Sequence, residues 1–245
     1  MEKFMGGIFA AVLLLFPATS VWAAALDELS PADQASVLAG QTLDFETNAD
    51  GTDWDESSWP RMTVYKLVHA SPEEAIAVMW DFPLQPKYMS AVVAADVKAR
   101  PAASQAQVEY TVKIPIVGQT KYTVLDSLST YDNGASYKFA CQLVQGDLVK
   151  SIDGVSRFEA VKDGTLMVYQ SLIIPKMIPA TSFTIQAGID QFKGTVEALG
   201  KQIETERTNG TPDDKAMLPL QLQQLRAALL PPKPAQMGFL EFLAP

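Results

Sequence analysis

Six segments between residues 91 and 175 have the alternation or the apolar content of β-strands, and only short turn signals separate them. Two of the breaks, Asn133-Gly134 and Asp163-Gly164, are dipeptides that favour tight hairpin turns. Parallel strands need long crossover connections, for which these breaks leave no room. The pattern therefore predicts an antiparallel sheet, built from residues 91–99, 106–115, 119–130, 136–144, 149–161 and 165–175.

The elements before these strands are also marked in the sequence. Residues 61–69 alternate and predict a further strand, which brings the sheet to about seven strands. Residues 71–74, Ser-Pro-Glu-Glu, have the capping serine, proline and acidic side chains of a helix start. Residues 86–89 predict a short helical turn, and a short helix is expected from Ser30 to Gly40. Residues 42–58 are acidic and are interpreted as an irregular loop.

Residues 181–207 predict a long amphipathic helix. Apolar residues recur there every three or four positions and so share one helical face, while the charged residues lie mostly elsewhere. A long helix after a run of strands favours a curved sheet wrapped around that helix. The apolar face would then be either packed core or the wall of a cavity, and it consists of Ile185, Ile189, Phe192, Val196, Leu199 and Ile203.

Composition excludes several classes of function. The net charge of −9 argues against nucleic-acid binding and against electrostatic attraction to anionic membranes. The chain has one cysteine, Cys141, and one histidine, His69, so an intramolecular disulfide and a multi-histidine metal site are both excluded. His69 is expected at a strand end, and Cys141 is expected as a small buried residue. We therefore predict no catalytic residues, no metal and no cofactor.

The N-terminus has the pattern of a secretion signal. An apolar run over residues 6–16 leads to small residues at the positions that signal peptidase requires for cleavage after Ala23 or Ala25. Residues 1–23 are thus expected to be a signal peptide. An uncleaved anchor is the alternative, because residues 4–26 are free of charge. Both interpretations place the body of the protein in an exported compartment, periplasmic or secreted.

The chain changes character after residue 207. A polar linker over residues 208–214 and a short helix over residues 218–230 are expected, followed by a proline-rich apolar tail to residue 245. We interpret residues 208–245 as an appendage that packs on the domain or contacts a membrane or a protein partner. The expected organisation is then a signal peptide, an N-terminal helix and acidic loop over residues 24–58, a ligand-binding domain over residues 59–207, and this tail.

Several short motifs accompany the order of elements. They are residues 69–74 at the first helix of the domain, residues 81–89 at its exit, residues 154–169 at the last hairpin, Pro175 and Pro179 before the long helix, and residues 29–40 in the preamble. Together with the order, these motifs resemble the START-like superfamily, also called SRPBCC or helix-grip. That superfamily includes START lipid-transfer domains, plant pathogenesis-related allergens and polyketide cyclases. The resemblance covers about residues 59–206; Pro83, Pro86 and the tail depart from the family pattern.

The resemblance implies an α+β helix-grip fold of order β-α-α-β6-α, with an apolar cavity between the sheet and the long helix. It implies a protein that binds or transfers a small hydrophobic molecule or lipid. Several strands are apolar on both faces, so the sequence leaves open which face is inward. The candidate cavity residues are Tyr110, Val112, Tyr122, Phe139, Cys141, Arg157, Phe158, Tyr169, Ile185, Ile189 and Phe192.

Two of these candidates carry alternatives. Arg157 would hold a carboxylate or head group if it points inward, and would pair with Glu159 or a neighbouring strand if it points outward. A cyclase- or aromatase-type enzyme is the second hypothesis, and it would need Arg157 or Tyr169 deep in the cavity as an acid or an orienting group. A third hypothesis is an interaction module with a filled core, which uses residues 218–243 as its contact.

Overall fold

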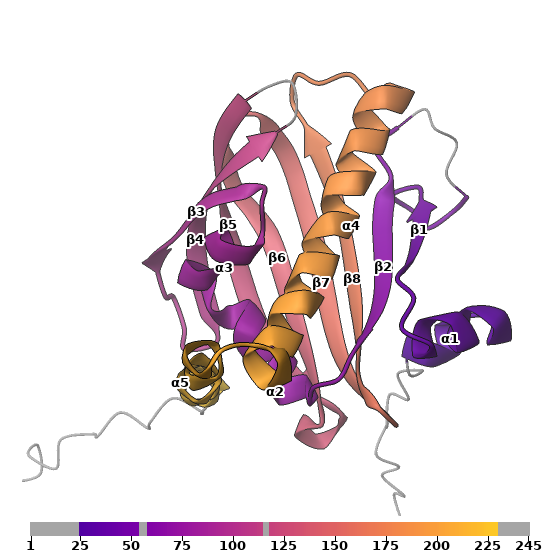
Figure 1. Ribbon diagram of the computed structural model, residues 1–245. Helices are drawn as coiled ribbons and strands as arrows, with labels where there is room; N and C mark the ends of the chain where they lie inside the picture. Colours follow the sequence, from indigo (N-terminus) through magenta and orange to yellow (C-terminus); the bar gives the residue numbers. More distant parts are fainter. Residues whose placement is uncertain (1–24, 54–57, 115–117, 230–245) are drawn as a thin grey trace, which may run out of the picture.

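The computed structural model describes residues 25–53, 58–114 and 118–229, and Figure 1 shows a curved sheet with one long helix lying across its face. The strands are β1 (Leu43–Thr47), β2 (Arg61–Val68), β3 (Val92–Ala99), β4 (Gln105–Ile114), β5 (Gly118–Tyr131), β6 (Ser136–Gly146), β7 (Val149–Val161) and β8 (Gly164–Pro175). The helices are η1 (Ala25–Glu28), α1 (Pro31–Leu38), α2 (Pro72–Trp80), η2 (Phe82–Leu84), α3 (Gln85–Tyr88), η3 (Asp132–Gly134), α4 (Ser182–Glu204), η4 (Thr205–Asn209) and α5 (Pro212–Leu229).

In the described part of the chain the sheet has eight strands in the order β1-β2-β8-β7-β6-β5-β4-β3, and every neighbouring pair is antiparallel. The predicted α+β fold with an antiparallel sheet and a long C-terminal helix is confirmed. The strand that the sequence does not reveal is β1, which lies within the acidic segment interpreted as a loop. It is an edge strand that pairs with β2 through its backbone, and its side chains are mostly half-buried without alternation. An edge strand of this kind has little hydrophobic pattern to detect.

Local capping explains where the two main helices begin. At α2, Ser71 Oγ accepts from the Glu74 N–H at 3.3 Å, and the Glu74 carboxylate accepts from the Ser71 N–H at 2.7 Å. This reciprocal pair satisfies two backbone donors that a helix start leaves free. Thr181 and Thr184 form the equivalent pair at α4. The helix start predicted at residues 71–74 is therefore confirmed.

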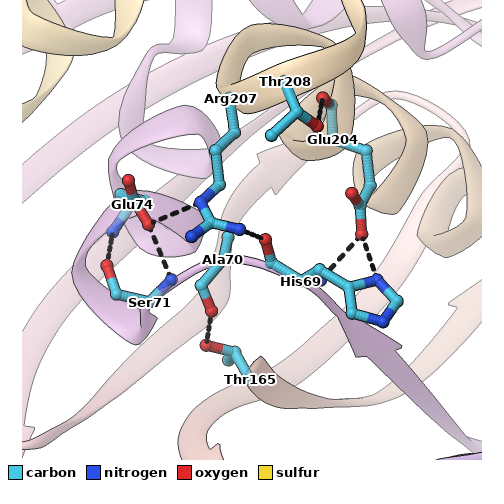
Figure 2. A network of polar contacts seen from close by, with 8 residues as sticks. All are labelled: His69, Ala70, Ser71, Glu74, Thr165, Glu204, Arg207 and Thr208. Carbon is cyan, nitrogen blue, oxygen red and sulfur yellow. Dashed lines mark hydrogen bonds and ion pairs between the residues drawn. The ribbon is translucent and has the colours of Figure 1, made fainter. Parts of the chain in front are cut away.

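A polar network holds the end of α4 against the junction between β2 and α2 (Figure 2). The Glu204 carboxylate accepts from the His69 N–H at 2.7 Å and lies 3.1 Å from His69 Nδ1. The Arg207 guanidinium donates to the His69 carbonyl oxygen and lies 3.4 Å from the Glu74 carboxylate. The His69 side chain is 63% exposed, at the strand end where it was expected. The contacts of His69 are those of a residue that positions α4.

The two largest apolar clusters of the described residues cover opposite faces of the sheet. The main core fills the concave side between the strands, α2, the C-terminal half of α4 and α5. The second lies on the outer face, where η1 and α1 cover β2 and β8, and it consists of Ala25, Leu29, Val37, Tyr65, Leu166 and Val168. This cover is the reason why β2 and β8 are apolar on both faces. A two-sided burial pattern cannot by itself identify the concave side.

The predicted linker over residues 208–214 is not a linker in the structure. It is occupied by the end of η4 and the first turn of α5, where the Asp214 N–H donates to Thr211 Oγ1 at 3.3 Å. The α5 helix packs against α2, and its Leu225 is fully buried in the main core. No helix among the described residues is long and apolar enough to span a membrane. The expected signal peptide and the apolar tail beyond residue 229 lie outside the described residues.

Candidate functional site

A cavity of about 510 Å³ lies between the concave face of the sheet and the N-terminal half of α4. Its walls come from β2 to β8, from α2, α3 and α4, and from the connection between β8 and α4. The long helix therefore has two roles along one face. Ile185 and Ile189 border the cavity, whereas Val196, Leu199 and Ile203 are packed in the main core. The sequence left open whether the apolar face of this helix is packed core or cavity wall. In the structure one part of the face is cavity wall and the other part is packed core.

Most of the candidate residues lie on this wall. The sheet contributes three tyrosines, one phenylalanine, one valine and the cysteine, and α4 contributes two isoleucines and a phenylalanine: Tyr110, Val112, Tyr122, Phe139, Cys141, Tyr169, Ile185, Ile189 and Phe192. Arg157 and Phe158 do not line the cavity. Phe158 is fully buried, but it belongs to the main core beneath α2, beyond the end of the cavity.

Arg157 points to the outer face of the sheet, which corrects its assignment as an inward anchor. Its guanidinium donates two hydrogen bonds to the Glu28 carboxylate, at 2.8 and 2.7 Å, and lies 3.4 Å from Glu159. Glu159 in turn accepts from the Ala25 N–H at 2.6 Å and from the Tyr131 hydroxyl at 2.9 Å. Successive side chains of a strand alternate between faces, so Arg157 faces away from the concave side that Ser156 lines. This cluster fastens η1 to the sheet.

The cavity ends where α2 begins to fill the concave side. Met79 of α2 and Phe139 of β6 border its inner end, and Leu128, Phe158 and Val196 beyond them are core. The strand register places Asp126 opposite Cys141, and Phe139 opposite Ser156. Cys141 is two residues from Phe139 on β6, so Asp126 on the neighbouring strand also lies near the inner end of the cavity.

Asp126 is the functional candidate that sequence reasoning missed. It is 1% exposed and lines the cavity. Among the described residues no nitrogen or oxygen group donates to its carboxyl group, and its hydrogen-bonding neighbour is the Cys141 thiol, a weak donor. Burial raises the pKa of Asp126 from 3.8 to about 7, and the neighbouring Cys141 thiol offsets only part of this rise. The sequence signal that could have identified Asp126 is its position in the alternation of side chains along β5. Asp126 shares the inward face of β5 with Tyr122, Val124 and Leu128, where an acidic side chain is out of place.

The other titratable groups of the inner cavity are weak acids. Burial raises the pKa values of Tyr110, Tyr122 and Tyr169 and of the Cys141 thiol well above their ordinary values. These four groups therefore remain protonated at neutral pH. Among the described residues no group of His, Cys, Asp and Glu side chains has the arrangement of a metal site. The inner cavity thus presents phenol and thiol groups around one carboxyl group.

The side of the cavity next to the β8–α4 connection is apolar and open. Ile173 and Met177 line it while 42% and 81% exposed, respectively. Phe183, in the first turn of α4, is 67% exposed. Large apolar side chains that remain exposed beside a cavity suit the passage of a hydrophobic ligand.

Comparison of the sequence with protein-family models and with curated proteins finds no match. Solved structures do match the fold. A STAR-related lipid transfer protein from Xanthomonas axonopodis is 16% identical with a TM-score of 0.57, over 66% of this chain and 93% of that chain. Human STARD10 is 13% identical with a TM-score of 0.58, over 78% of both chains. A Thermus thermophilus protein is 14% identical with a TM-score of 0.51, over 60% of this chain and 98% of that chain.

Proposed function

We propose that this chain, which has the START-like helix-grip fold, binds a small hydrophobic molecule or lipid in the cavity beneath α4. The observation that carries the proposal is the cavity itself, about 510 Å³ of space walled largely by apolar and aromatic side chains. Well-packed protein interiors leave few voids larger than a water molecule, so a cavity of this size is retained for an occupant. The Xanthomonas protein of similar fold is a lipid transfer protein, which is consistent with such an occupant.

The energetics of burial suit this role. Burying about 400 Å² of apolar ligand surface is worth about 10 kcal/mol at about 25 cal/mol per Å². Association costs at least about 4 kcal/mol of that amount. The remaining free energy of about 6 kcal/mol corresponds to a dissociation constant of tens of micromolar, before any polar contact is added. An apolar wall with one polar anchor is thus sufficient for binding.

Binding is tested by displacement of a dansyl-labelled fatty acid from the purified protein, together with mass spectrometry of molecules that co-purify from a native host. In the variant Ser171→Phe, a ring is added to a buried position of the cavity wall. We expect it to reduce probe affinity at least about tenfold, because the added ring occupies ligand volume. Ser129→Phe, at an exposed position of β5, is the matched control. Equal binding by wild type and Ser171→Phe would contradict the proposal.

A cyclase- or aromatase-type enzyme acting in the same cavity is the second candidate. The observation that favours it is Asp126, because a buried carboxyl group with a pKa of about 7 is suited to general acid–base catalysis at neutral pH. The two functions differ in the fate of the ligand. Recovery of a co-purified ligand unchanged after long incubation supports binding. Conversion that is lost in Asp126→Asn supports the enzyme.

We also propose that the protein is exported through its N-terminal segment, and one contact of Ala25 favours the first of the two expected cleavage positions. Ala25 is fully buried and its N–H donates to Glu159, so cleavage after Ala23 preserves this contact while cleavage after Ala25 removes it. We therefore expect Ala24 as the first residue of the exported protein. The intact mass of protein recovered from the periplasm or the medium tests this; a mature chain that begins at Leu26, or retention of residues 1–23, would contradict it.

A further inference from the structure

Among the described residues, no nitrogen or oxygen group donates to the carboxyl group of Asp126, although it is almost completely buried. Its hydrogen-bonding neighbour among them is the Cys141 thiol, a weak donor, and the side chain lines the inner end of the cavity. Burying an ionised carboxylate without a partner is costly, and buried polar groups in proteins are normally hydrogen-bonded. The cavity is the space that this side chain borders. A ligand is therefore the natural source of a strong donor to this carboxyl group.

The described part of the cavity wall supplies no positive charge near this carboxyl group. Among the cavity-lining residues that the structure describes, none is lysine, arginine or histidine. The titratable groups that act on or are influenced by Asp126 are the Cys141 thiol on β6 and the phenols of Tyr110, Tyr122 and Tyr169 on β4, β5 and β8. The lining residues of α2, α3, α4 and β7 carry no titratable side chain. Within the described residues, the site therefore has one carboxyl group and no positively charged side chain to pair with it.

The aromatic rings of the inner cavity add a second preference for positive charge. The Tyr110 and Tyr122 rings lie 5.5 Å apart, and the Tyr169 and Phe192 rings lie 5.3 Å apart, all within the cavity wall. Faces of aromatic rings attract cations through their quadrupole, most strongly where water is excluded. A quaternary ammonium group would use the rings but could not donate to Asp126. A protonated primary or secondary amine can do both.

We propose that the cavity selects a hydrophobic molecule that carries a protonated primary or secondary amine, whose N–H groups donate to Asp126 while its apolar part lies along α4. This inference rests on the proposed ligand-binding function and names its ligand class. A cationic amine favours the ionised carboxylate, so binding below pH 7 releases the proton of Asp126. Affinity for the amine should therefore rise with pH, by about 100-fold between pH 5 and pH 8, given a pKa of about 7 in the free protein.

The test compares four ligands of one chain length by isothermal titration calorimetry with the full chain, below the concentrations at which they form micelles. They are dodecylamine, dodecan-1-ol, dodecanoate and dodecyltrimethylammonium. We expect wild type to bind dodecylamine at least about tenfold more tightly than the other three, as one charge-assisted hydrogen bond predicts. Asp126→Asn keeps the shape of the side chain and should remove this preference. Asp190→Asn removes a carboxyl group from the exposed side of α4 and should retain it.

The outcomes separate this inference from the proposed function. Binding of dodecan-1-ol or dodecanoate without preference for the amine would overturn the amine inference and leave hydrophobic binding intact. Preference for dodecyltrimethylammonium would assign the selectivity to the rings and would also overturn it. No binding of any of the four ligands would overturn both. The pH dependence in wild type needs no variant, so a flat profile for dodecylamine from pH 5 to pH 8 also overturns it.

Discussion

Asp126 on β5 and Cys141 on β6 are direct cross-strand partners, and both side chains line the inner cavity. The pairing places a carboxyl group beside a thiol in a buried site that contains no described basic residue. Burial raises the pKa of both groups, so each favours its protonated, neutral form. The inner cavity of the empty protein is therefore close to neutral at mildly acidic pH and becomes negative as Asp126 ionises.

The first prediction concerns the pH dependence of stability. The folded-state pKa of Asp126, about 7, lies above the ordinary value of 3.8, so the folded state binds the proton more tightly. The contribution of Asp126 to the free energy of unfolding should fall as pH rises from about 4 to about 7, by up to about 4 kcal/mol, and should stay at the lower level above that range. Asp126→Asn removes this dependence. Its stability relative to wild type should increase by about 2 to 3 kcal/mol between pH 5 and pH 8 in urea unfolding.

Asp190→Asn is the control for the loss of one carboxyl group, because Asp190 lies on the exposed side of α4. Its stability relative to wild type should not follow the same pH course. Parallel pH profiles for wild type and Asp126→Asn would mean that Asp126 is ionised in the folded protein at pH 5.

The second prediction concerns the reactivity of Cys141. Burial raises the pKa of its thiol, and the thiolate is the reactive form. We expect the thiol of the folded protein to react with a disulfide reagent at pH 8 at least about 100-fold more slowly than the thiol in urea. A chain that carries both Cys141→Ser and Ser129→Cys moves the single thiol to an exposed position and provides the fast reference. Equal rates of reaction with the reagent for the two folded proteins would mean that the Cys141 thiol is exposed to solvent.

The third prediction concerns Arg157. Replacing it with alanine removes the two hydrogen bonds to Glu28 and leaves Glu159, whose side chain is 10% exposed, without its cation. Arg157→Ala should lower the free energy of unfolding by about 1 to 3 kcal/mol, because the mostly buried Glu159 carboxylate loses its positively charged partner. Ligand affinity should remain within about twofold of wild type, since Arg157 faces away from the cavity.

Lys98→Ala is the matched control for Arg157, because its ion pair with Glu109 on the surface should be worth less than about 1 kcal/mol. A loss of ligand affinity of tenfold or more in a folded Arg157→Ala protein would mean that Arg157 contacts the ligand in the cavity.

The fourth prediction concerns α5. Leu225 is fully buried in the main core, while Leu220 on the same helix is 56% exposed. Leu225→Ala should lower the free energy of unfolding by about 3 kcal/mol through lost burial and the cavity it leaves, and Leu220→Ala by less than about 1 kcal/mol. Urea unfolding of the two variants measures the difference. Similar small effects for both would mean that α5 is not part of the folded domain in solution.

Much of this fold follows from local sequence signals. The turn dipeptides, the alternation of the strands and the caps at Ser71 and Thr181 act within a few residues, so they predict element boundaries closely. The period of residues 185–203 identifies the buried face of α4. The sequence does not fully predict the elements that are stabilised mainly by contacts with neighbouring elements. β1 has no alternation of its own, and α5 begins in a polar segment that was interpreted as a linker.

The sequence by itself determined the order of the elements, the antiparallel sheet and the apolar face of the long helix, because periodicity and capping are properties of short stretches of chain. Only the tertiary structure decided which face of each strand is inward, because η1 and α1 cover the outer face of β2 and β8. It also decided that Arg157 pairs with Glu28, 129 residues away, and that Asp126 is enclosed beside a thiol with no nitrogen or oxygen donor among the described residues. Burial and ion pairing between distant residues depend on distances through space, which local patterns do not contain.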